Sequence, residues 1–380
     1  MRQEAKLSVL ERVFAEIDVK PGAKEETQSG IQMMRPRIYG MLEREPGVKV
    51  GVILMHPASN FMNHHMVRAL SERGIACMGL NNRYVNNDSV LLMERAIQDL
   101  GAGVKWMRAQ GCDKVVLLGY SGGAALSAFY QAQAEKLTVQ STPAGDPVPL
   151  VAGDLPRVDG LVFCAAHAGR SRLLLEWIDP SVTDEGDAAS CDPALDMYDS
   201  TNGIPYSKEF LRRYRAGQLK RRDKIEAWVW ERLQSLRAVP NGATDQAFVV
   251  HRTFADPRFQ DMTIDPSDRK PGGMWGNAKG VNYASNAIGR YTSLTAFLSQ
   301  WASVSQADGP DNAAKTSCPV LYVDFTADEA SFPSTRDLWL NALGKRAAFH
   351  AVKGADHYIK GRPELLAEAG DVIADWVKRL

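Results

Sequence analysis

The chain has 380 residues, of which 45% are hydrophobic and 24% charged, proportions that exclude collagen-like and disordered chains and fit a globular protein. Lys and Arg together number 45 and so do Asp and Glu, so the formal net charge is zero and a protein built mainly to bind nucleic acid or an anionic membrane is not expected. At roughly 100–200 residues per domain, the length fits one large domain or two ordinary ones.

The N-terminal stretch MRQEAKLSVLERVFAEIDVK carries charges throughout and lacks the apolar core of a secretory signal. No apolar run in the sequence approaches the ~20 residues that span a bilayer. The five cysteines are an odd number, lie far apart and form no CxxC pair, which is typical of reduced and mostly buried thiols. We therefore predict a cytoplasmic protein without a membrane span.

Near-continuous apolar runs, typical of strands buried on both faces of a parallel sheet, recur along the chain. Strands are predicted at 48–55, 75–80, 114–119, 158–164, 319–325 and 347–352, and helices around Met66 and Leu70 and at 90–110, 122–136 and 363–379. Because strands that alternate with helices form βαβ units, the sequence predicts an α/β fold with a doubly wound, mostly parallel sheet.

This alternation stops between about 168 and 312. The segment is rich in Pro, Gly, Asp and Arg, and it is too long for a structureless loop in a folded domain. We predict a mainly helical cap at 169–312, inserted late in the sheet of a core made of 1–168 and 313–380. Since small-molecule pockets are lined mainly by apolar and aromatic side chains, the tryptophans of the cap favour an apolar or aromatic substrate. These tryptophans are Trp177, Trp228, Trp230, Trp275 and Trp301.

The segment Gly119-Tyr120-Ser121-Gly122-Gly123 joins an apolar strand to an alanine-rich helix. A serine on such a sharp turn is held in strained backbone geometry, and only small residues two positions before and after it avoid a clash. The turn lifts the serine Oγ above the sheet edge and aims the next backbone N–H at a developing oxyanion. We therefore predict Ser121 as a nucleophile and the Gly122 N–H as an oxyanion donor.

A nucleophilic serine needs a base, and seven histidines compete for that role. His357 follows the last predicted strand, so it falls on the same rim of the sheet as Ser121, and it is the favoured base. His167, just past the strand at 158–164, faces the same rim and is its main rival. We expect His350, within the last predicted strand, to be a core residue, and the pair His64 and His65 to lie on a surface helix turn. His251 lies in the predicted cap and has no motif around it.

The base in turn needs a carboxylate that orients it. Asp328 follows the strand at 319–325 and precedes His357 by enough residues for one helix and one strand. The chain order is then Ser, Asp, His, the order of α/β-hydrolases. Asp324 and Glu329 remain alternatives if the loop is built differently, whereas Asp356 adjoins His357 on a chain whose neighbouring side chains usually point apart.

The second oxyanion donor is expected in the loop after the first strong strand, Met55-His56-Pro57-Ala58-Ser59-Asn60. Pro57 has no N–H to donate. The Ala58 N–H is therefore the favoured donor, and the Ser59 N–H comes next.

Together these segments resemble the α/β-hydrolase superfamily. The matching pieces, which lie within about residues 30–168 and 313–380, are the oxyanion-type loop LMHPASN, the nucleophile elbow GYSGG, the acid loop DFTADE and the histidine loop KGADHY. The resemblance implies an eight-stranded, mostly parallel sheet, a cofactor-free Ser-His-Asp triad and an acyl-serine intermediate. Pro57 departs from the family pattern, because many relatives have Gly after the histidine. A serine at the elbow, in place of Asp, argues against the haloalkane dehalogenases.

The leading hypothesis is a serine hydrolase that cleaves a carboxylic ester, thioester or lactone of a small-molecule substrate. The same triad would also serve a C–C bond hydrolase or an acyltransferase. A third reading, a non-catalytic binding protein on a hydrolase scaffold, would predict a damaged triad, and none of its residues is missing. Since HExxH, paired CxxC and DxDxDG patterns are absent from the sequence, neither a catalytic metal nor a cofactor is expected.

Overall fold

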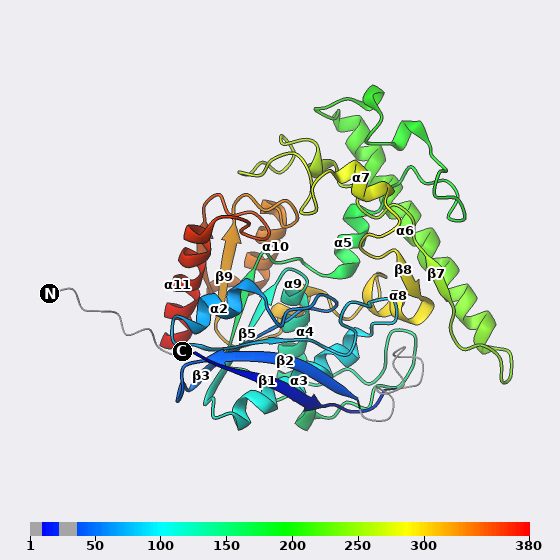
Figure 1. The fold of residues 1–380 in the computed structure, drawn as a ribbon. Coiled ribbons are helices and arrows are strands. Elements are labelled where there is room, and N and C mark those ends of the chain that lie inside the picture. Colours follow the sequence, from blue (N-terminus) through cyan, green and yellow to red (C-terminus); the bar gives the residue numbers. More distant parts are fainter. Residues whose placement is uncertain (1–9, 23–35) are drawn as a thin grey trace.

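The computed structural model describes residues 10–22 and 36–380, and within them one sheet has the strand order β1-β2-β4-β3-β5-β6-β9-β10 (Figure 1). Strand β2 runs antiparallel to both of its neighbours, and the pairs from β4 to β10 are parallel. The strands are Glu11–Asp18 (β1), Arg37–Arg44 (β2), Val50–Met55 (β3), Ala76–Leu80 (β4), Lys114–Tyr120 (β5), Gly160–Cys164 (β6), Val320–Phe325 (β9) and Ala347–Val352 (β10). The predicted doubly wound, mostly parallel sheet is confirmed.

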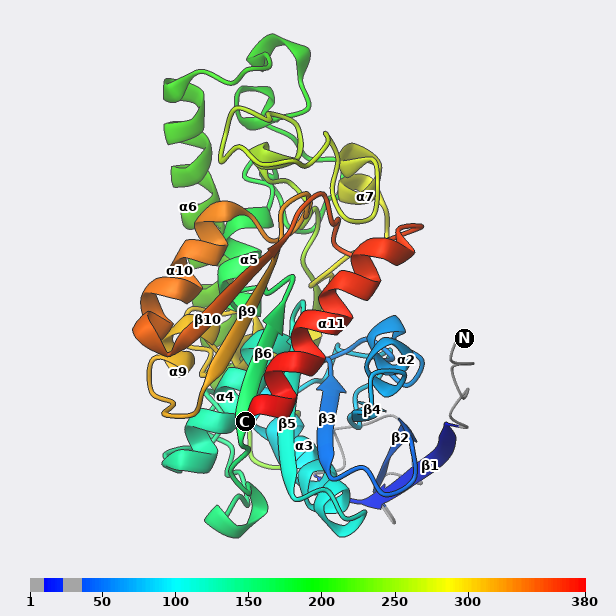
Figure 2. The ribbon, with the colours of Figure 1, turned by 90° about the vertical axis from the view of Figure 1, so that its left-hand side faces the viewer.

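Helices cover both faces of this sheet. One face carries α3, α4 and α10, and the other carries α2 and α11; α11 crosses the face turned to the viewer in Figure 2. Their bounds are His65–Ser71 (α2), Met93–Ala109 (α3), Gly123–Glu135 (α4), Pro333–Leu343 (α10) and Pro363–Arg379 (α11). All five lie where the sequence predicts helices or a strand-to-strand crossover.

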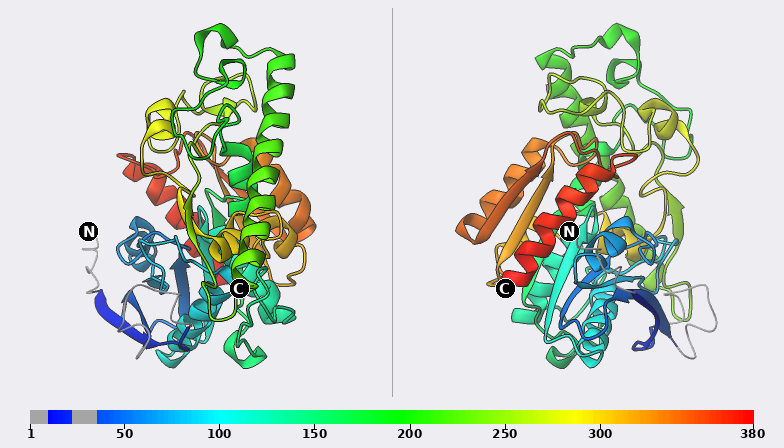
Figure 3. Two further views of the ribbon diagram at one scale, coloured as in Figure 1. Left: turned by 90° about the vertical axis from the view of Figure 1, so that its right-hand side faces the viewer. Right: turned by 60° about the vertical axis from the view of Figure 1, so that its left-hand side comes forward.

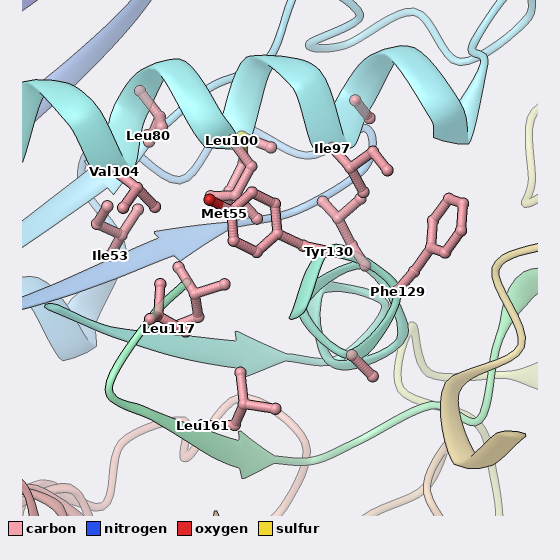
Figure 4. Packing of buried hydrophobic residues seen from close by; sticks show 14 of the residues in the cluster. Ile53, Met55, Leu80, Ile97, Leu100, Val104, Leu117, Phe129, Tyr130 and Leu161 are labelled. Carbon is pink, nitrogen blue, oxygen red and sulfur yellow. The ribbon is translucent and has the colours of Figure 1, made fainter. Parts of the chain in front are cut away.

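Both faces of the central strands are apolar because successive side chains of a strand point to opposite sides. In β3, Ile53 packs under α3 and α4, whereas its neighbour Leu54 packs under α2 and α11. Figure 4 shows the first of these cores, in which Leu117 and Leu161 of adjacent strands face Val104 of α3. The near-continuous apolar runs of the sequence are the result of this two-sided burial.

Strands β1 and β2 were not among the predicted elements. They form an antiparallel hairpin at the edge of the sheet, where Ala15 is buried while Phe14 and Tyr39 stack in solvent with ring centroids 5.7 Å apart. Because only one face of β1 is covered, charged residues alternate with apolar ones and hide the strand signal. Part of the N-terminal stretch analysed above (1–9) and the start of the region that resembles the hydrolases (30–35) lie outside the described residues.

A long insertion leaves the sheet after β6 and returns at β9. It lies beyond the carboxyl ends of the parallel strands and continues down one side of the sheet along α6 (Figures 1 and 3). Its elements are Arg170–Trp177 (α5), Lys208–Arg237 (α6), Ala247–Val249 (β7), Ala278–Tyr283 (α7), Tyr291–Ser293 (β8), Leu294–Gln300 (α8) and Gly309–Ala313 (α9). An insertion late in the sheet is therefore present where the sequence predicts one; most of its regular elements are helices, joined by long irregular segments such as 238–277.

Helix α6 organises the insertion. The Ser207 side chain caps its first turn by accepting a hydrogen bond from the Phe210 N–H at 3.1 Å. Its buried residues recur every three or four positions, so a mostly apolar stripe packs on α5 and α8, and several basic residues, such as Arg212 and Lys220, are exposed. Arg221 is an exception, because it is buried in an ion pair with Glu185 at 2.7 Å.

Two further sequence predictions concern the whole chain. Cys77, Cys112, Cys164 and Cys318 are buried and Cys191 is exposed, and all five thiols are free. Among the helices of residues 10–22 and 36–380, none combines the length and the apolar character that a bilayer crossing requires.

The core of Figure 4 predicts a clear stability effect. Leu117→Ala removes a fully buried side chain from the central strand β5, and we expect it to lower the free energy of unfolding by about 2–5 kcal/mol. The same change at Leu338, which is exposed on α10, should stay within about 0.5 kcal/mol of the wild type. Urea denaturation of the two variants measures the difference, and equal midpoints would contradict this description of the core.

Candidate active site

The turn between β5 and α4 holds Ser121 in an unusual backbone conformation. Its φ is 56°, in the left-handed region that residues other than glycine rarely adopt. The Ser121 N–H donates to the Cys164 carbonyl at 3.1 Å, and its own carbonyl accepts from the His167 N–H at 3.2 Å and the Ala124 N–H at 3.1 Å. These hydrogen bonds tie the strained residue to the ends of two adjacent structural elements.

The glycines on either side of Ser121 are required by close backbone packing. A Cβ at Gly119 would lie 2.4 Å from the Cα of Ala124, and a Cβ at Gly123 would lie 2.5 Å from the carbonyl oxygen of Met55. Neither neighbour is a flexible side chain that could move aside. The small residues of the GYSGG segment are therefore explained by the tight strand-to-helix turn that the sequence predicts.

Three side chains from the ends of three different strands meet beside this turn. The Ser121 Oγ lies 3.1 Å from Nε2 of His357, and Nδ1 of His357 lies 2.9 and 3.0 Å from the two carboxylate oxygens of Asp328. All three residues are buried. The structure thus brings together the serine, the histidine and the aspartate that the sequence singles out.

The surroundings of Asp328 keep its carboxylate ionised. Burial alone would raise its pKa, but the nearby His357 and the hydrogen bonds from His357, Ser331 and Ala330 outweigh burial, so the pKa is lowered from its usual value. The Ala330 and Ser331 N–H groups donate to one carboxylate oxygen at 2.7 and 2.9 Å. A fixed negative charge beside Nδ1 favours the tautomer in which Nε2 is free to accept a proton.

The alternative acids have other partners. Asp324 lies 3.4 Å from a guanidinium nitrogen of Arg336, and Glu329 accepts a hydrogen bond from the His357 backbone N–H at 3.3 Å. The Tyr120 hydroxyl donates to the His357 carbonyl at 2.5 Å and so fixes the backbone of the loop that carries His357. Neither alternative acid is bonded to the imidazole, although Glu329 helps to position the histidine loop.

His167, the rival base, lies against His357 and not against the serine. The two rings stack with centroids 5.3 Å apart and an interplanar angle of 24°. Burial, followed by repulsion from His357, lowers the His167 pKa to about 3, so its imidazole is neutral. Its Nε2 is buried without a hydrogen-bond partner in the described residues. His167 therefore lines the cavity beside His357.

The predicted oxyanion donors differ in their engagement. The Gly122 N–H makes no hydrogen bond within the part of the chain that the structure describes, and it directly follows Ser121. The Ala58 and Ser59 N–H groups, by contrast, donate to Nδ1 of His56 at 3.1 and 2.8 Å. Both N–H groups expected from this loop are thus occupied by an imidazole whose role the sequence does not suggest.

A cavity of about 710 Å³ opens over the serine. Its floor comes from the loop after β3 and the turn between β5 and α4, and its roof comes from α5 and the segment 274–288 of the insertion. The side chains of the roof are mostly apolar; the polar lining residues include Asn286 and the ion pair of Arg170 with Asp88 at 2.6 Å. Of the five tryptophans of the insertion, Trp275 alone lines the cavity, while Trp177 and Trp301 are buried elsewhere in the insertion.

The predicted surface position of His64 and His65 is wrong. Both line the cavity, their rings lie 4.1 Å apart, and the His64 ring packs edge-on to Tyr120 at 4.6 Å. His64 also caps α2, since its Nδ1 accepts from the Met66 N–H at 3.3 Å. Burial lowers the His64 pKa well below its usual value and the His65 pKa to about 4. Both rings are therefore neutral near pH 7.

His350 is also misplaced by the sequence prediction. It is not a core residue, because β10 is an edge strand with an exposed face, and its Nε2 lies 2.9 Å from a carboxylate oxygen of Glu368. His251, in the insertion, is absent from the residues that line the cavity, as expected from its lack of a motif. Within residues 10–22 and 36–380, no three or more His, Cys, Asp or Glu side chains are grouped as metal ligands.

Comparison with known proteins identifies the fold. No family model and no curated protein matches the chain. Among solved structures, DcsB in complex with its substrate analogue is 13% identical with a TM-score of 0.52, and the match covers 97% of this chain and 99% of that one. The esterase domain of a Rhodothermus marinus protein is also 13% identical, with a TM-score of 0.45 and coverage of 97% and 98%. For the monoacylglycerol lipase of Paleococcus ferrophilus, the identity is 13%, the TM-score 0.46 and the coverage 90% and 98%. The strand order and the likeness to DcsB show an α/β-hydrolase fold.

The packing of the elbow leads to a test that needs no substrate. Gly119→Ala places a methyl group 2.4 Å from backbone, and we expect it to cost about 1–3 kcal/mol and to lower the thermal midpoint. The control is Gly153→Ala, because a Cβ at Gly153 meets nothing within 4 Å. Calorimetry compares the two variants, and an unchanged midpoint for Gly119→Ala would contradict the tight turn.

Proposed function

We propose that this α/β-hydrolase-fold protein is a serine hydrolase that cleaves a carboxylic ester through an acyl-serine intermediate. The observation that carries the proposal is the unbroken hydrogen-bonded chain from Ser121 to His357 to Asp328, with Ser121 in the lining of a cavity. Nucleophile, base and orienting acid within hydrogen-bond reach of one another are the signature of an activated serine.

The first half of the reaction follows from this geometry. The Ser121 Oγ attacks the ester carbonyl carbon while its proton passes to Nε2 of His357. The π electrons of the carbonyl move to its oxygen, next to the N–H of Gly122 at the start of α4, which bonds to no described residue. Asp328 stays ionised and stabilises the imidazolium through Nδ1.

The intermediate then collapses. The C–O bond to the alcohol breaks, and the leaving oxygen takes the proton from Nε2 of His357, which leaves an acyl group on Ser121. Water attacks this acyl group in the second half, giving its proton to the same nitrogen, and the carboxylic acid leaves when Ser121 regains its proton. His357 is thus base and acid in turn, and the net products are an alcohol and an acid.

The insertion supports a substrate with an apolar or aromatic group. We assign 169–312 as a cap over the core formed by 1–168 and 313–380, and its contribution to the cavity includes Leu173 and Trp275. A volume of about 710 Å³ lies in the range of roughly 300–1,000 Å³ that holds small-molecule ligands. The free thiols, four of them buried, suit a reducing compartment, and we propose the cytoplasm.

Replacing the nucleophile tests the proposal. With p-nitrophenyl esters of increasing acyl length, we expect wild-type turnover and a loss of at least about 10³-fold in kcat for Ser121→Ala, because the covalent step is removed. The acyl length with the highest kcat/KM then measures the apolar part of the cavity. Equal turnover by Ser121→Ala and wild type would refute the proposal.

The identity of the acid is tested separately. Asp328→Asn leaves the shape of the site but favours the wrong imidazole tautomer, so we expect kcat to fall by about 10⁴-fold with little change in KM. Asp324→Asn is the matched control and should keep kcat within a few-fold of wild type, since Asp324 pairs with Arg336. The reverse pattern would assign the acid to Asp324.

A further inference from the structure

We infer that the His56 side chain, through its Nε2–H, is the second donor of the oxyanion hole and acts together with the Gly122 N–H. This inference rests on the proposed function and adds a catalytic residue to it. Three observations carry it: the hydrogen bonds at the other ring nitrogen of His56, the position of Nε2, and the occupied backbone N–H groups of the same loop.

The hydrogen bonds of Nδ1 fix the tautomer. His56 directly follows β3, and its Nδ1 accepts from the Ala58 N–H at 3.1 Å and the Ser59 N–H at 2.8 Å. A ring nitrogen that accepts backbone hydrogen bonds carries no proton, so the proton of the neutral ring is on Nε2. Nε2 is therefore a donor, held in a fixed orientation by two bonds on the opposite side of the ring.

Nε2 lies next to the nucleophile. A Cβ at Gly122, the residue after Ser121, would lie 2.9 Å from Nε2 of His56. The imidazole thus occupies the space that a side chain at position 122 would fill, and both residues line the cavity with Ser121. An Nε2–H at this place flanks the same region as the Gly122 N–H, which has no other partner in the described residues.

The ring is also in the right charge state. Burial, followed by repulsion from Arg170, His167 and His357, lowers the His56 pKa well below its usual value. His56 is therefore neutral near pH 7 and can donate from Nε2 without placing a second cation beside the imidazolium of His357. A fixed neutral donor aimed at developing charge needs no reorganisation during the reaction.

The two backbone donors that the sequence predicts in this loop are both engaged already. Pro57 has no N–H, and the N–H groups of Ala58 and Ser59 are both used by Nδ1. In effect, the imidazole takes up two backbone N–H groups on one side and presents one N–H on the other. On this inference, Nε2–H of His56 takes the donor role that the sequence predicts for the Ala58 N–H.

His56 neither gains nor loses a proton during the proposed reaction. As the bond from Ser121 Oγ to the carbonyl carbon forms, the π pair moves to the carbonyl oxygen and the serine proton moves to His357. The resulting oxyanion accepts from the Gly122 N–H and from Nε2–H of His56, which keeps its proton throughout. When the intermediate collapses, the pair returns to the carbonyl and the two hydrogen bonds weaken.

Two substitutions separate this role from loop support. In His56→Asn, the amide oxygen can still accept from the N–H groups two and three residues on, as Asn does in turns, but no donor reaches the Nε2 position. In His56→Gln, the longer side chain returns an N–H to that position and gives up the Nδ1 acceptor. A donor role therefore predicts an impaired Asn variant and a rescued Gln variant, whereas a loop-support role predicts the opposite order.

The experiment measures kcat and KM with p-nitrophenyl butyrate, the rate at which a fluorophosphonate modifies Ser121, and the thermal midpoint of each variant. We expect His56→Asn to lose about 10²–10³-fold in kcat and in modification rate with little change in KM, and His56→Gln to stay within about tenfold of wild type. If His56→Asn does not fold, the Gln variant decides alone, because loop support predicts a large loss for it.

Failure of the donor role of His56 and failure of the proposed function give different results. Wild-type rates in His56→Asn, or a large loss in His56→Gln, would overturn the donor role and leave the triad standing. If the wild-type Ser121 neither turns over esters nor reacts with the fluorophosphonate, the proposed function itself fails, and this inference fails with it.

Discussion

The left-handed backbone of Ser121, at the turn from β5 into α4, is the constraint on which the rest of the site depends. A residue other than glycine in this region costs on the order of 1–3 kcal/mol, which hydrogen bonds to the Cys164 carbonyl and from the His167 N–H offset. The same turn forces glycine at 119 and 123 and aims the serine Oγ at His357, and it leaves the Gly122 N–H without a hydrogen bond to any described residue. A relaxed turn would lose all of these features together.

Electrostatics then distinguish one histidine from the others around the cavity. His357 has a buried carboxylate at Nδ1, whereas His167 stacks on it without a carboxylate partner, and His64 and His65 are kept neutral by burial. In the proposed mechanism, the lowered pKa values of these rings make them poor acceptors for the serine proton. The carboxylate of Asp328 favours His357 as the base.

The features that could be predicted from the sequence are those that leave a mark on neighbouring positions of the chain. Two-sided burial makes the central strands visible as apolar runs, and tight backbone contacts make the elbow visible as glycines at 119 and 123. It missed the one-sided edge strands β1 and β2, where charged residues alternate with apolar ones. It also missed His56, because only the three-dimensional placement of its ring against Gly122 reveals a role. Composition likewise does not tell which tryptophans of the insertion reach the cavity, and of the five Trp275 alone lines it.

The measurement that tests the central claim most directly is the trapping of the acyl-enzyme. With an activated p-nitrophenyl ester, acylation outpaces hydrolysis, so rapid mixing and acid quenching should capture the intermediate. The account predicts a burst of about one p-nitrophenol per chain and a mass increase of one acyl group on the peptide that contains Ser121. Steady ester turnover without acyl transfer to Ser121, or with the acyl group on another residue, would contradict it.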